Sequence, residues 1–256
     1  MSRMSSDRVF VGWLLQYLSS KQIVVAAFLL ATTLLVLFRM NCFHGFLQRN
    51  LAPHFRKPGT GFFGFLCRQF LKGNRPLEET AFRSLDAQPH HKILEIGFGY
   101  GHGISYALDN GMRDGSGVVY GMDFSAEACD HVRKLLINDL KSGKLEIIFG
   151  DVANIPLKES TIDRVFHTNC YYFWPEPLNV CREILRVMTP GGIMTTGIEP
   201  EKVKRAALSG VIEPCQIDPD FYIECLVEAG FEHVRMEEAS YQRNGHKVIF
   251  AQKKKV

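Results

Sequence analysis

Short apolar runs alternate with longer mixed segments over the C-terminal three quarters of the chain. Five such runs, each of strand length and separated by helix-length intervals, lie at residues 92–95, 118–123, 145–150, 164–169 and 193–198. Strands that alternate with helices are typical of a parallel α/β sheet. The run Thr189-Pro190-Gly191-Gly192 is a stop-and-turn signal, so we predict that a helix over 182–188 ends there, before the fifth strand.

A glycine-rich turn follows the first predicted strand. Glu95 ends that strand, and Gly97, Gly99 and Gly101 follow at alternate positions. Glycine tolerates positive φ and lets the backbone approach a bulky ligand closely. In an open α/β sheet, the loop after the first strand is where a nucleotide-like cofactor binds. The glycine pattern by itself fits both dinucleotides and S-adenosylmethionine (SAM), so it does not identify the ligand.

Further candidate contacts follow the next three strands. Asp123 ends the second strand, with Phe124 after it, and a carboxylate there can accept both ribose hydroxyls of an adenosine ligand. Asp151 follows the third strand, where it can accept from the adenine amino group while the Val152 amide meets a ring nitrogen. Asn169, after the fourth strand, is a candidate for lining the same pocket. Asp123 and Asp151 are alternatively cap or turn residues, but their shared strand-end position favours binding. For Asn169, capping of the next turn fits as well as lining the pocket.

In this combination the chain resembles the class I SAM-dependent methyltransferases, and within them the small-molecule branch that includes the ubiquinone and menaquinone methyltransferases. The resemblance covers about residues 58–256 and rests on the glycine loop, the two later acids and the Pro190-Gly191-Gly192 turn. Glu228-Ala229-Gly230-Phe231, followed by two predicted strands, is similar to the end of that family's sheet. The resemblance implies a Rossmann-like, doubly wound, seven-stranded sheet with a C-terminal reversed β-hairpin, and SAM as the cofactor.

A nicotinamide-type dinucleotide site is the alternative for the glycine loop. Its fingerprint reads GxGxxG, whereas the third glycine here, Gly101, comes one residue early, and Gly103 permits only a forced match. This alternative also leaves Asp151, the segment around Asn169 and the terminal hairpin unexplained. The spacing therefore favours SAM.

An aromatic segment follows the fourth predicted strand. Tyr171, Tyr172 and Trp174 are candidates for an apolar wall around a flat or hydrophobic acceptor, and packing in the core is the alternative for at least half of the segment. Asn169 is followed by Cys170 and Tyr171, not by the Pro-Pro-aromatic sequence of the methylases that act on exocyclic amines of DNA and on glutamine. That difference argues against those substrates.

The N-terminal region carries a long apolar run. Residues 22–38 contain no charge and are almost wholly aliphatic, and at about 1.5 Å per residue they fall just short of the hydrocarbon thickness of a bilayer. Arg39 can snorkel and residues 40–46 add apolar length, so we expect a hydrophobic helix that anchors the chain in a membrane. A cleaved signal peptide or a mitochondrial presequence fits less well, because the run is continuous and no small-residue cleavage site follows it.

The expected organisation is an anchor region with a linker at residues 1–57 and a methyltransferase domain at 58–256. Basic residues are slightly more numerous after the apolar run than before it, which by the positive-inside rule places the domain in the cytosol. The C-terminal Lys253-Lys254-Lys255-Val256 is similar to a dilysine retrieval signal, and a basic strand end is the alternative. We therefore expect a single-pass anchor in the endoplasmic reticulum rather than a mitochondrial location.

Composition narrows the range of partners. The net charge is +3, and the Lys and Arg residues are scattered, which gives no argument for nucleic-acid binding. The seven cysteines are odd in number and form no Cys-x-x-Cys pair, which argues against structural zinc and for a reduced compartment. We expect no metal and no nucleic-acid partner.

The expected function is methyl transfer from SAM to a small, hydrophobic or lipid-like acceptor at a membrane. A non-catalytic SAM-binding or scaffold protein with the same fold is the alternative, because intact binding residues do not establish turnover. A sulfonium methyl group is already activated, so a general base is needed only if the nucleophile arrives protonated. His102 and His167 are candidates for that base, but a single histidine is more often structural, and no catalytic residue is assigned.

Overall fold

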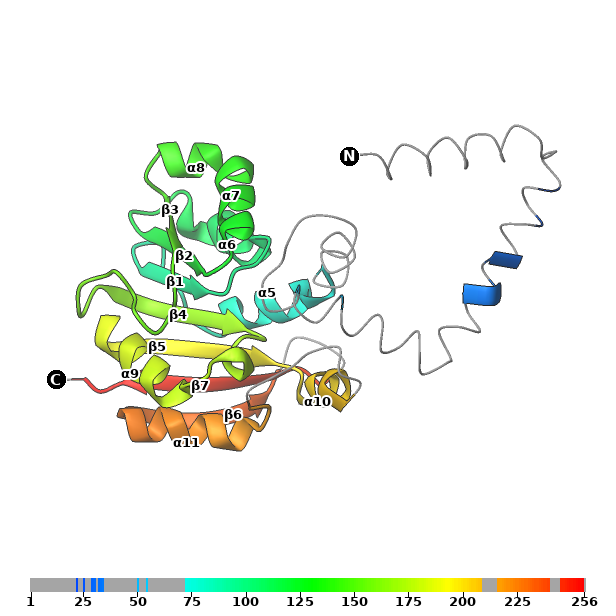
Figure 1. Cartoon of the computed structure of the whole chain (residues 1–256). Helices are drawn as coiled ribbons and strands as arrows, with labels where there is room; N and C mark the ends of the chain where they lie inside the picture. Colours follow the sequence, from blue (N-terminus) through cyan, green and yellow to red (C-terminus); the bar gives the residue numbers. More distant parts are fainter. Residues whose placement is uncertain are drawn as a thin grey trace. The chain divides into compact units, whose positions relative to one another are not determined.

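The computed structural model describes residues 72–208, 216–239 and 245–255, together with scattered residues between 22 and 54. The chain divides into two compact units, Met1–Leu47 and Gln48–Val256. The second unit consists of one twisted sheet with helices on both faces (Figure 1). The expected boundary between residues 57 and 58 lies outside the described residues and stays a prediction.

The sheet has seven strands in the order β3-β2-β1-β4-β5-β7-β6. The first five are mutually parallel, whereas β7 runs antiparallel to both β5 and β6. The expected Rossmann-like sheet with a reversed C-terminal hairpin is therefore confirmed. All five parallel strands end at one edge, here called the carboxyl edge. The strands are β1 (Lys92–Ile96), β2 (Val118–Asp123), β3 (Leu145–Phe149), β4 (Ile162–Thr168), β5 (Met188–Ile198), β6 (Phe231–Glu238) and β7 (Lys247–Lys253).

An apolar core lies on each face of the sheet, because successive strand residues point to opposite faces. Ile93 and Val119 belong to the core that α5, α6 and α7 cover. Leu94 and Tyr120 belong to the core that α9 and α11 cover. The helices are α5 (Arg75–Arg83), α6 (His102–Ala107), α7 (Ala126–Leu135), α8 (Ile137–Lys141), α9 (Pro177–Val187), α10 (Pro200–Leu208) and α11 (Pro219–Ala229), with single turns η1 (Lys72–Asn74), η2 (Leu108–Met112) and η3 (Tyr171–Phe173).

Two boundaries differ from the predicted ones. The helix expected over 182–188 is α9, which already begins at Pro177. β5 begins at Met188, not at residue 193, because Met188 pairs with Ile162 of β4 before the register shifts. The Thr189–Gly192 run is thus an irregularity inside a strand and not a free turn, and its glycine at 191 has a φ of +79°. Pro and Gly are tolerated in strands at such bulges.

Local chemistry accounts for the last helix and the reversed hairpin. The Asp218 side chain accepts from the Asp220 amide at the start of α11, and Pro219 occupies the first helical position. Gly230 ends the helix with a φ of +106°, a conformation that favours glycine. The chain then enters β6 directly, so the Ala229-Gly230-Phe231 signal is confirmed.

The N-terminal unit is described only at scattered positions. Val25, Leu29, Leu30 and Leu34 are helical, and each side chain is 44% to 62% exposed. Among the described residues, no helix is long and apolar enough to cross a membrane. Most of the hydrophobic helix expected over residues 22–38 lies outside the described residues, so the anchor stays a prediction.

Candidate cofactor site

The glycine loop leaves the carboxyl end of β1 in a conformation that favours glycine. Gly97, Gly99 and Gly101 have φ values of +68°, +54° and +76°. The Gly97 amide donates to the Met122 carbonyl of β2 at 2.8 Å. At Gly101 a Cβ atom would also come within 2.7 Å of a Val132 methyl group on α7. Both the backbone angle and the close helix contact therefore exclude a side chain at Gly101.

Asp123 connects the end of β2 to this loop. Its Oδ2 accepts from the Gly99 amide at 2.9 Å, and its Oδ1 accepts from the Ser125 amide at 2.8 Å. The side chain is buried, and burial raises the pKa of its carboxyl group despite these two bonds. An ionised carboxylate has further lone pairs on each oxygen. Asp123 can thus hold the loop and accept from a ligand hydroxyl at the same time.

Two exposed aromatic residues lie at the carboxyl edge beside Asp123. Phe124 is 41% exposed, and Phe149 at the end of β3 is 56% exposed. The strand register pairs Asp123 with Phe149, so the two phenyl groups come from adjacent strand ends. Such rings can stack on a flat heterocycle. Phe124 was a sequence candidate; Phe149 was not, and its only signal was an aromatic residue directly before Gly150 and Asp151.

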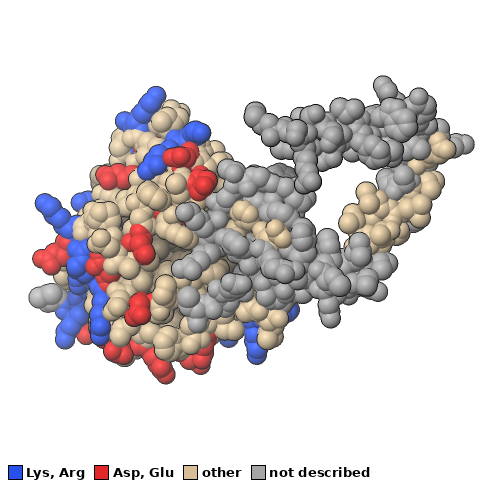
Figure 2. Space-filling model, viewed as in Figure 1, with Lys and Arg blue, Asp and Glu red and all other residues tan. Residues whose placement is uncertain are grey.

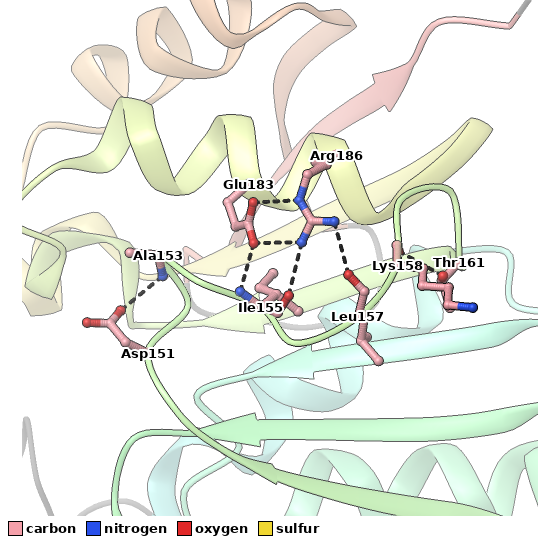
Figure 3. Close-up of polar contacts among 8 residues, drawn as sticks. All are labelled: Asp151, Ala153, Ile155, Leu157, Lys158, Thr161, Glu183 and Arg186. Atoms are coloured by element: carbon pink, nitrogen blue, oxygen red, sulfur yellow. Dashed lines mark hydrogen bonds and ion pairs between the residues drawn. The ribbon is translucent and has the colours of Figure 1, made fainter.

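The loop after β3 carries Asp151 and is fastened to α9 (Figure 3). Asp151 is exposed, and its Oδ1 accepts from the Ala153 amide at 2.9 Å. Glu183 accepts from the Ile155 amide at 2.8 Å and is held by two bonds from Arg186, which also donates to the Ile155 carbonyl. This bidentate pair fixes the loop, including the buried Val152. Binding by Asp151 and Val152 stays a prediction.

Two buried carboxyl groups lie beside the start of α6. Glu95 of β1 and Glu78 of α5 each have a buried Oε2 atom that has no hydrogen-bond partner among the described residues. Burial, followed by the charges of Glu78 and Asp123, raises the pKa of Glu95 well above its ordinary value. A Cβ at Gly103 would collide with the Glu95 carboxylate, so that glycine makes room for it. Glu78 was missed, because an acidic pair on an amphipathic helix looks like a solvated surface.

Glu78→Gln is expected to stabilise the protein at high pH. Burial raises the pKa of Glu78 from its ordinary value of 4.5 to about 7. Between these values the folded state binds a proton that the unfolded chain has lost, so wild-type stability falls as pH rises through this window. Above this pH window the loss of stability has its full size, and Glu78→Gln removes that loss because glutamine carries no charge. We expect a gain of about 1–3 kcal/mol in the free energy of unfolding at about pH 8, measured by urea titration.

The difference between the two proteins should shrink toward about pH 4, below the ordinary pKa of 4.5, where Glu78 is mostly protonated in both states. Glu79→Gln is the control, because Glu79 lies on the same helix and pairs with His102 at 3.1 Å. A gain for Glu78→Gln that is equal at both pH values would contradict the assignment.

Asn169 follows β4 at the same edge. Its φ is +52°, and within the described part of the chain its buried Oδ1 atom has no hydrogen-bond partner. A positive φ is uncommon for residues other than glycine, although asparagine tolerates it best. Its amide donates to the Gly197 carbonyl of β5 at 3.4 Å. Asn169 thus follows β4, which pairs with β1, and carries a buried acceptor, while a contact with the cofactor stays a prediction.

The aromatic segment after Asn169 packs inward. Tyr171, Tyr172 and Trp174 are 2%, 5% and 7% exposed and belong to the core under α9 and α11. The Tyr171 ring stacks on Tyr222 with centroids 4.5 Å apart, and its hydroxyl donates to the Ile217 carbonyl at 3.0 Å. In the described part of the chain these rings pack in the core, and their predicted role in lining an acceptor site stays a prediction.

His167 is fully engaged in that core. Its Nε2 lies 2.9 Å from the Tyr222 hydroxyl and 2.9 Å from the Thr196 hydroxyl, and its Nδ1 lies 3.2 Å from the Cys170 sulfur. Burial lowers the pKa of His167 to about 3. A base with both nitrogens occupied and so low a pKa takes no proton from a substrate at neutral pH. His102, the other sequence candidate, pairs with Glu79.

The carboxyl edge thus offers a positive-φ glycine loop, a carboxylate that holds the loop, exposed aromatic rings, and buried carboxyl oxygens without partners. These groups suit a ligand with hydroxyls, a flat base and a positive charge. Among the described residues no cluster of His, Cys, Asp and Glu is arranged to hold a metal ion. On the face shown in Figure 2, Lys and Arg side chains are interspersed with Asp and Glu over the described residues.

Residues 94–196 match the family described as "Methyltransferase domain". An uncharacterised methyltransferase of Bacillus subtilis is 26% identical over 129 residues, which is 50% of this chain and 67% of that protein. The sarcosine/dimethylglycine N-methyltransferase of Halorhodospira halochloris is 22% identical over 67% of this chain and 62% of its own length. The demethylmenaquinone methyltransferase of Bacillus mycoides is 31% identical over 43% of this chain and 45% of its own length.

Solved structures show the same fold. A SAM-dependent methyltransferase from Aquifex aeolicus superposes with a TM-score of 0.58 at 20% identity, over 72% of this chain and 95% of that chain. Human N-acetylserotonin methyltransferase in complex with SAM gives 0.59 at 16% identity, over 78% of this chain and 58% of that one. Together with the family match and the carboxyl-edge geometry, these similarities identify residues 94–196 as a methyltransferase domain of the class I, SAM-dependent type, with SAM as its cofactor.

Proposed function

We propose that this chain is a membrane-anchored methyltransferase that transfers the methyl group of SAM to a small, hydrophobic or lipid-like acceptor. The observation that carries the cofactor part is the bond from the Gly99 amide to Asp123, which joins the glycine loop to the strand-end acid. In this proposal Asp123 takes the ribose hydroxyls, and the Glu95 carboxyl faces the ammonium group. The ends of β2 and β3, with Phe124 and Phe149, receive the adenine.

SAM supplies a methyl group that is already electrophilic, because it is bonded to a positively charged sulfur. The protein's task is therefore to bind both reactants, to hold the nucleophile in line at near-attack distance, and to exclude water. The glycine loop lets the backbone come close to the cofactor. The buried Asn169 Oδ1 directly follows β4, one of the two strands that flank the switch between β1 and β4.

The membrane part of the proposal rests on the apolar run at residues 22–38. Its described members Val25, Leu29, Leu30 and Leu34 expose apolar side chains, and contiguous exposed apolar surface is typical of membrane or protein contact. We propose an anchor with the catalytic domain on the cytosolic side, at the endoplasmic reticulum. The C-terminal lysines are the sequence feature that favours this location. Lys253, the first of them, also has a structural role at the end of β7, where it donates to the Leu185 and Met188 carbonyls.

The acceptor class is inferred from the membrane segment and from the relatives. Two of the relatives are named for demethylmenaquinone, which is a quinone, and for sarcosine, which is a small amine. Neither similarity covers two thirds of the relative's own length. A membrane-anchored enzyme acts most readily on a substrate that partitions into the same membrane, so a lipid-like acceptor is the better fit to this chain.

Methyl transfer from labelled SAM tests the proposal. We expect the full-length protein in membranes to place label in material that extracts into organic solvent, and Asp123→Ala to reduce it. Label found only in protein would count against the proposal. SAM binding without any labelled product would favour the non-catalytic alternative, since a shared fold does not fix the chemistry. The same fractions test the anchor, because an anchored protein stays with the membranes at high salt and leaves with detergent.

A further inference from the structure

A histidine–glutamate pair lies at the carboxyl edge, outside the groups described so far. Glu199 directly follows β5, and His246 directly precedes β7. The Nε2 atom of His246 lies 3.2 Å from Oε1 of Glu199, and the two side chains are 8% and 16% exposed. The register that pairs Ile198 with Lys247 brings the two residues together across the antiparallel strands.

The other nitrogen of His246 has no partner among the residues that the structure describes. Its Nδ1 atom is buried and makes no hydrogen bond. An ionised carboxylate only accepts hydrogen bonds, so a neutral imidazole must place its proton on Nε2, facing Glu199. Nδ1 then carries the free lone pair. A neutral histidine whose far nitrogen is fixed by a carboxylate is the arrangement of an oriented general base.

A comparison with His167 indicates that a purely structural role does not explain the unpaired nitrogen of His246. His167 is also buried, yet its Nε2 lies within hydrogen-bond distance of the Tyr222 hydroxyl and its Nδ1 lies close to the Cys170 sulfur. Buried polar atoms in folded proteins are nearly always paired, because an unpaired one destabilises the fold. The Nδ1 atom of His246 therefore points to a hydrogen-bond donor that arrives from outside the described fold.

The strand order says which ligand that donor belongs to. The order reverses between β1 and β4, and ligands of open α/β sheets bind in the crevice at that switch. Apart from Asn169, the groups assigned to the cofactor lie at the ends of β1, β2 and β3, on one side of the switch. Glu199 follows β5 and His246 precedes β7, on the other side. Asn169 also lies on that side, because it follows β4, and its backbone amide donates to the Gly197 carbonyl of β5. Because the cofactor groups lie mainly on the other side of the switch, we expect the methyl acceptor to bind on the side of β5 and β7.

We propose that His246 is the general base of the methyl transfer and that the acceptor group is a hydroxyl, which donates to Nδ1 before reaction. This inference rests on the proposed function. Transfer forms a bond between the acceptor oxygen and the methyl carbon and breaks the carbon–sulfur bond, whose electron pair stays on sulfur. The hydroxyl proton moves to Nδ1, and the resulting imidazolium is stabilised by Glu199 and later releases the proton to water.

Glu199 acts in this scheme as a positioning residue. Its Oε1 is shared with Lys202, whose ammonium group lies 3.4 Å away and also contacts Asn74 at 3.4 Å. The carboxylate is thus held from α10 as well as from His246. This fixes both the orientation and the tautomer of the imidazole.

His246→Gln separates a base from a structural residue, because the glutamine amide can still donate to Glu199 but has no basic nitrogen at the Nδ1 position. The probes are para-hexylphenol and its thiol counterpart para-hexylbenzenethiol. A thiol loses its proton far more readily than a phenol, so it needs no base at mildly alkaline pH. We expect kcat with the phenol to fall about 10²–10⁴-fold and kcat with the thiol to change less than about 10-fold.

Calorimetry with SAM gives a second readout that does not depend on turnover, and His246→Gln should bind SAM like the wild type. Glu199→Gln should show the same selectivity for the thiol with a smaller loss on the phenol. His91→Gln is the control, because His91 precedes β1 at the opposite edge of the sheet, where its Nδ1 accepts from the Gln88 amide. It should behave as the wild type in every assay.

Equal losses on phenol and thiol, or a phenol rate within about 10-fold of wild type, would overturn the assignment of His246. If the wild type uses neither probe, the labelled product from the lipid extract replaces them. That product must then be an O-methyl compound whose formation falls at least about 100-fold in His246→Gln. Methylation on carbon, nitrogen or sulfur would also overturn the inference. A wild type that labels nothing would instead refute the proposed function.

Discussion

Replacing Gly99 with valine should remove measurable SAM binding while the domain stays folded. Gly99 has a φ of +54°, and a Cβ added there meets no atom within 4 Å. The added side chain therefore enters open space, on the loop that the Asp123 carboxylate holds and where the cofactor is proposed to lie. We expect affinity to fall at least about 100-fold, because closely packed atoms cannot move aside for the cofactor without strain. Calorimetry with SAM and with its demethylated product measures this directly.

The strain of a positive φ must be separated from the effect on binding. A left-handed conformation costs a residue with a Cβ about 1–2 kcal/mol, so Gly99→Val will also lower stability. Gly143→Val is a matched control, because Gly143 has a φ of +72° and likewise no atom within 4 Å of an added Cβ. It lies between α8 and β3, away from the loop. We expect it to lose similar stability and keep full affinity. Normal SAM affinity in Gly99→Val would refute the loop assignment.

Asp123→Ala should weaken SAM binding by about 1–3 kcal/mol, which is roughly 5- to 150-fold. Two effects combine. The ribose hydroxyls lose their acceptor, and the Gly99 and Ser125 amides lose the carboxylate that holds the loop in place. The binding loss is therefore expected to come with a lower melting temperature, and calorimetry with SAM at several temperatures measures the two effects on one sample.

A second buried aspartate provides the control for Asp123. Asp139 is about as buried as Asp123, and its carboxylate pairs with Arg113 at 2.8 Å on the outer helices. Asp139→Ala should destabilise the protein without changing SAM affinity at a temperature where it is folded. Unchanged affinity in Asp123→Ala would take Asp123 out of the site, whereas equal losses in both variants would show that the effect is only one of stability.

Much of the fold and most of the proposed cofactor-binding residues could be predicted from the sequence, because they depend on local chemistry. The strand runs, the acids Glu95, Asp123 and Asp151 at their ends, and the glycines at 97 and 99 all depend on residues within a few positions of each other. Apolar periodicity and turn residues report such contiguous structure directly. The same holds for Gly230, whose left-handed conformation ends α11 and turns the chain into β6.

Burial and long-range pairing were decided only by the tertiary structure. Tyr171 and Trp174 look equally suited to a pocket wall and to a core until Tyr222 of α11 packs against both rings. The Thr189–Gly192 run reads as a turn, yet it lies within β5 because Met188 pairs with β4.

Glu78 looks like a surface residue until β1 places Glu95 beside it. His246 and Glu199 lie far apart along the chain and meet only because β7 runs back along β5. A short stretch of chain determines its own φ and ψ preferences, whereas the partners of a side chain are set by how distant strands align. For that reason the strand ends and the glycine loop were predictable from the chain, and the proposed general base was not.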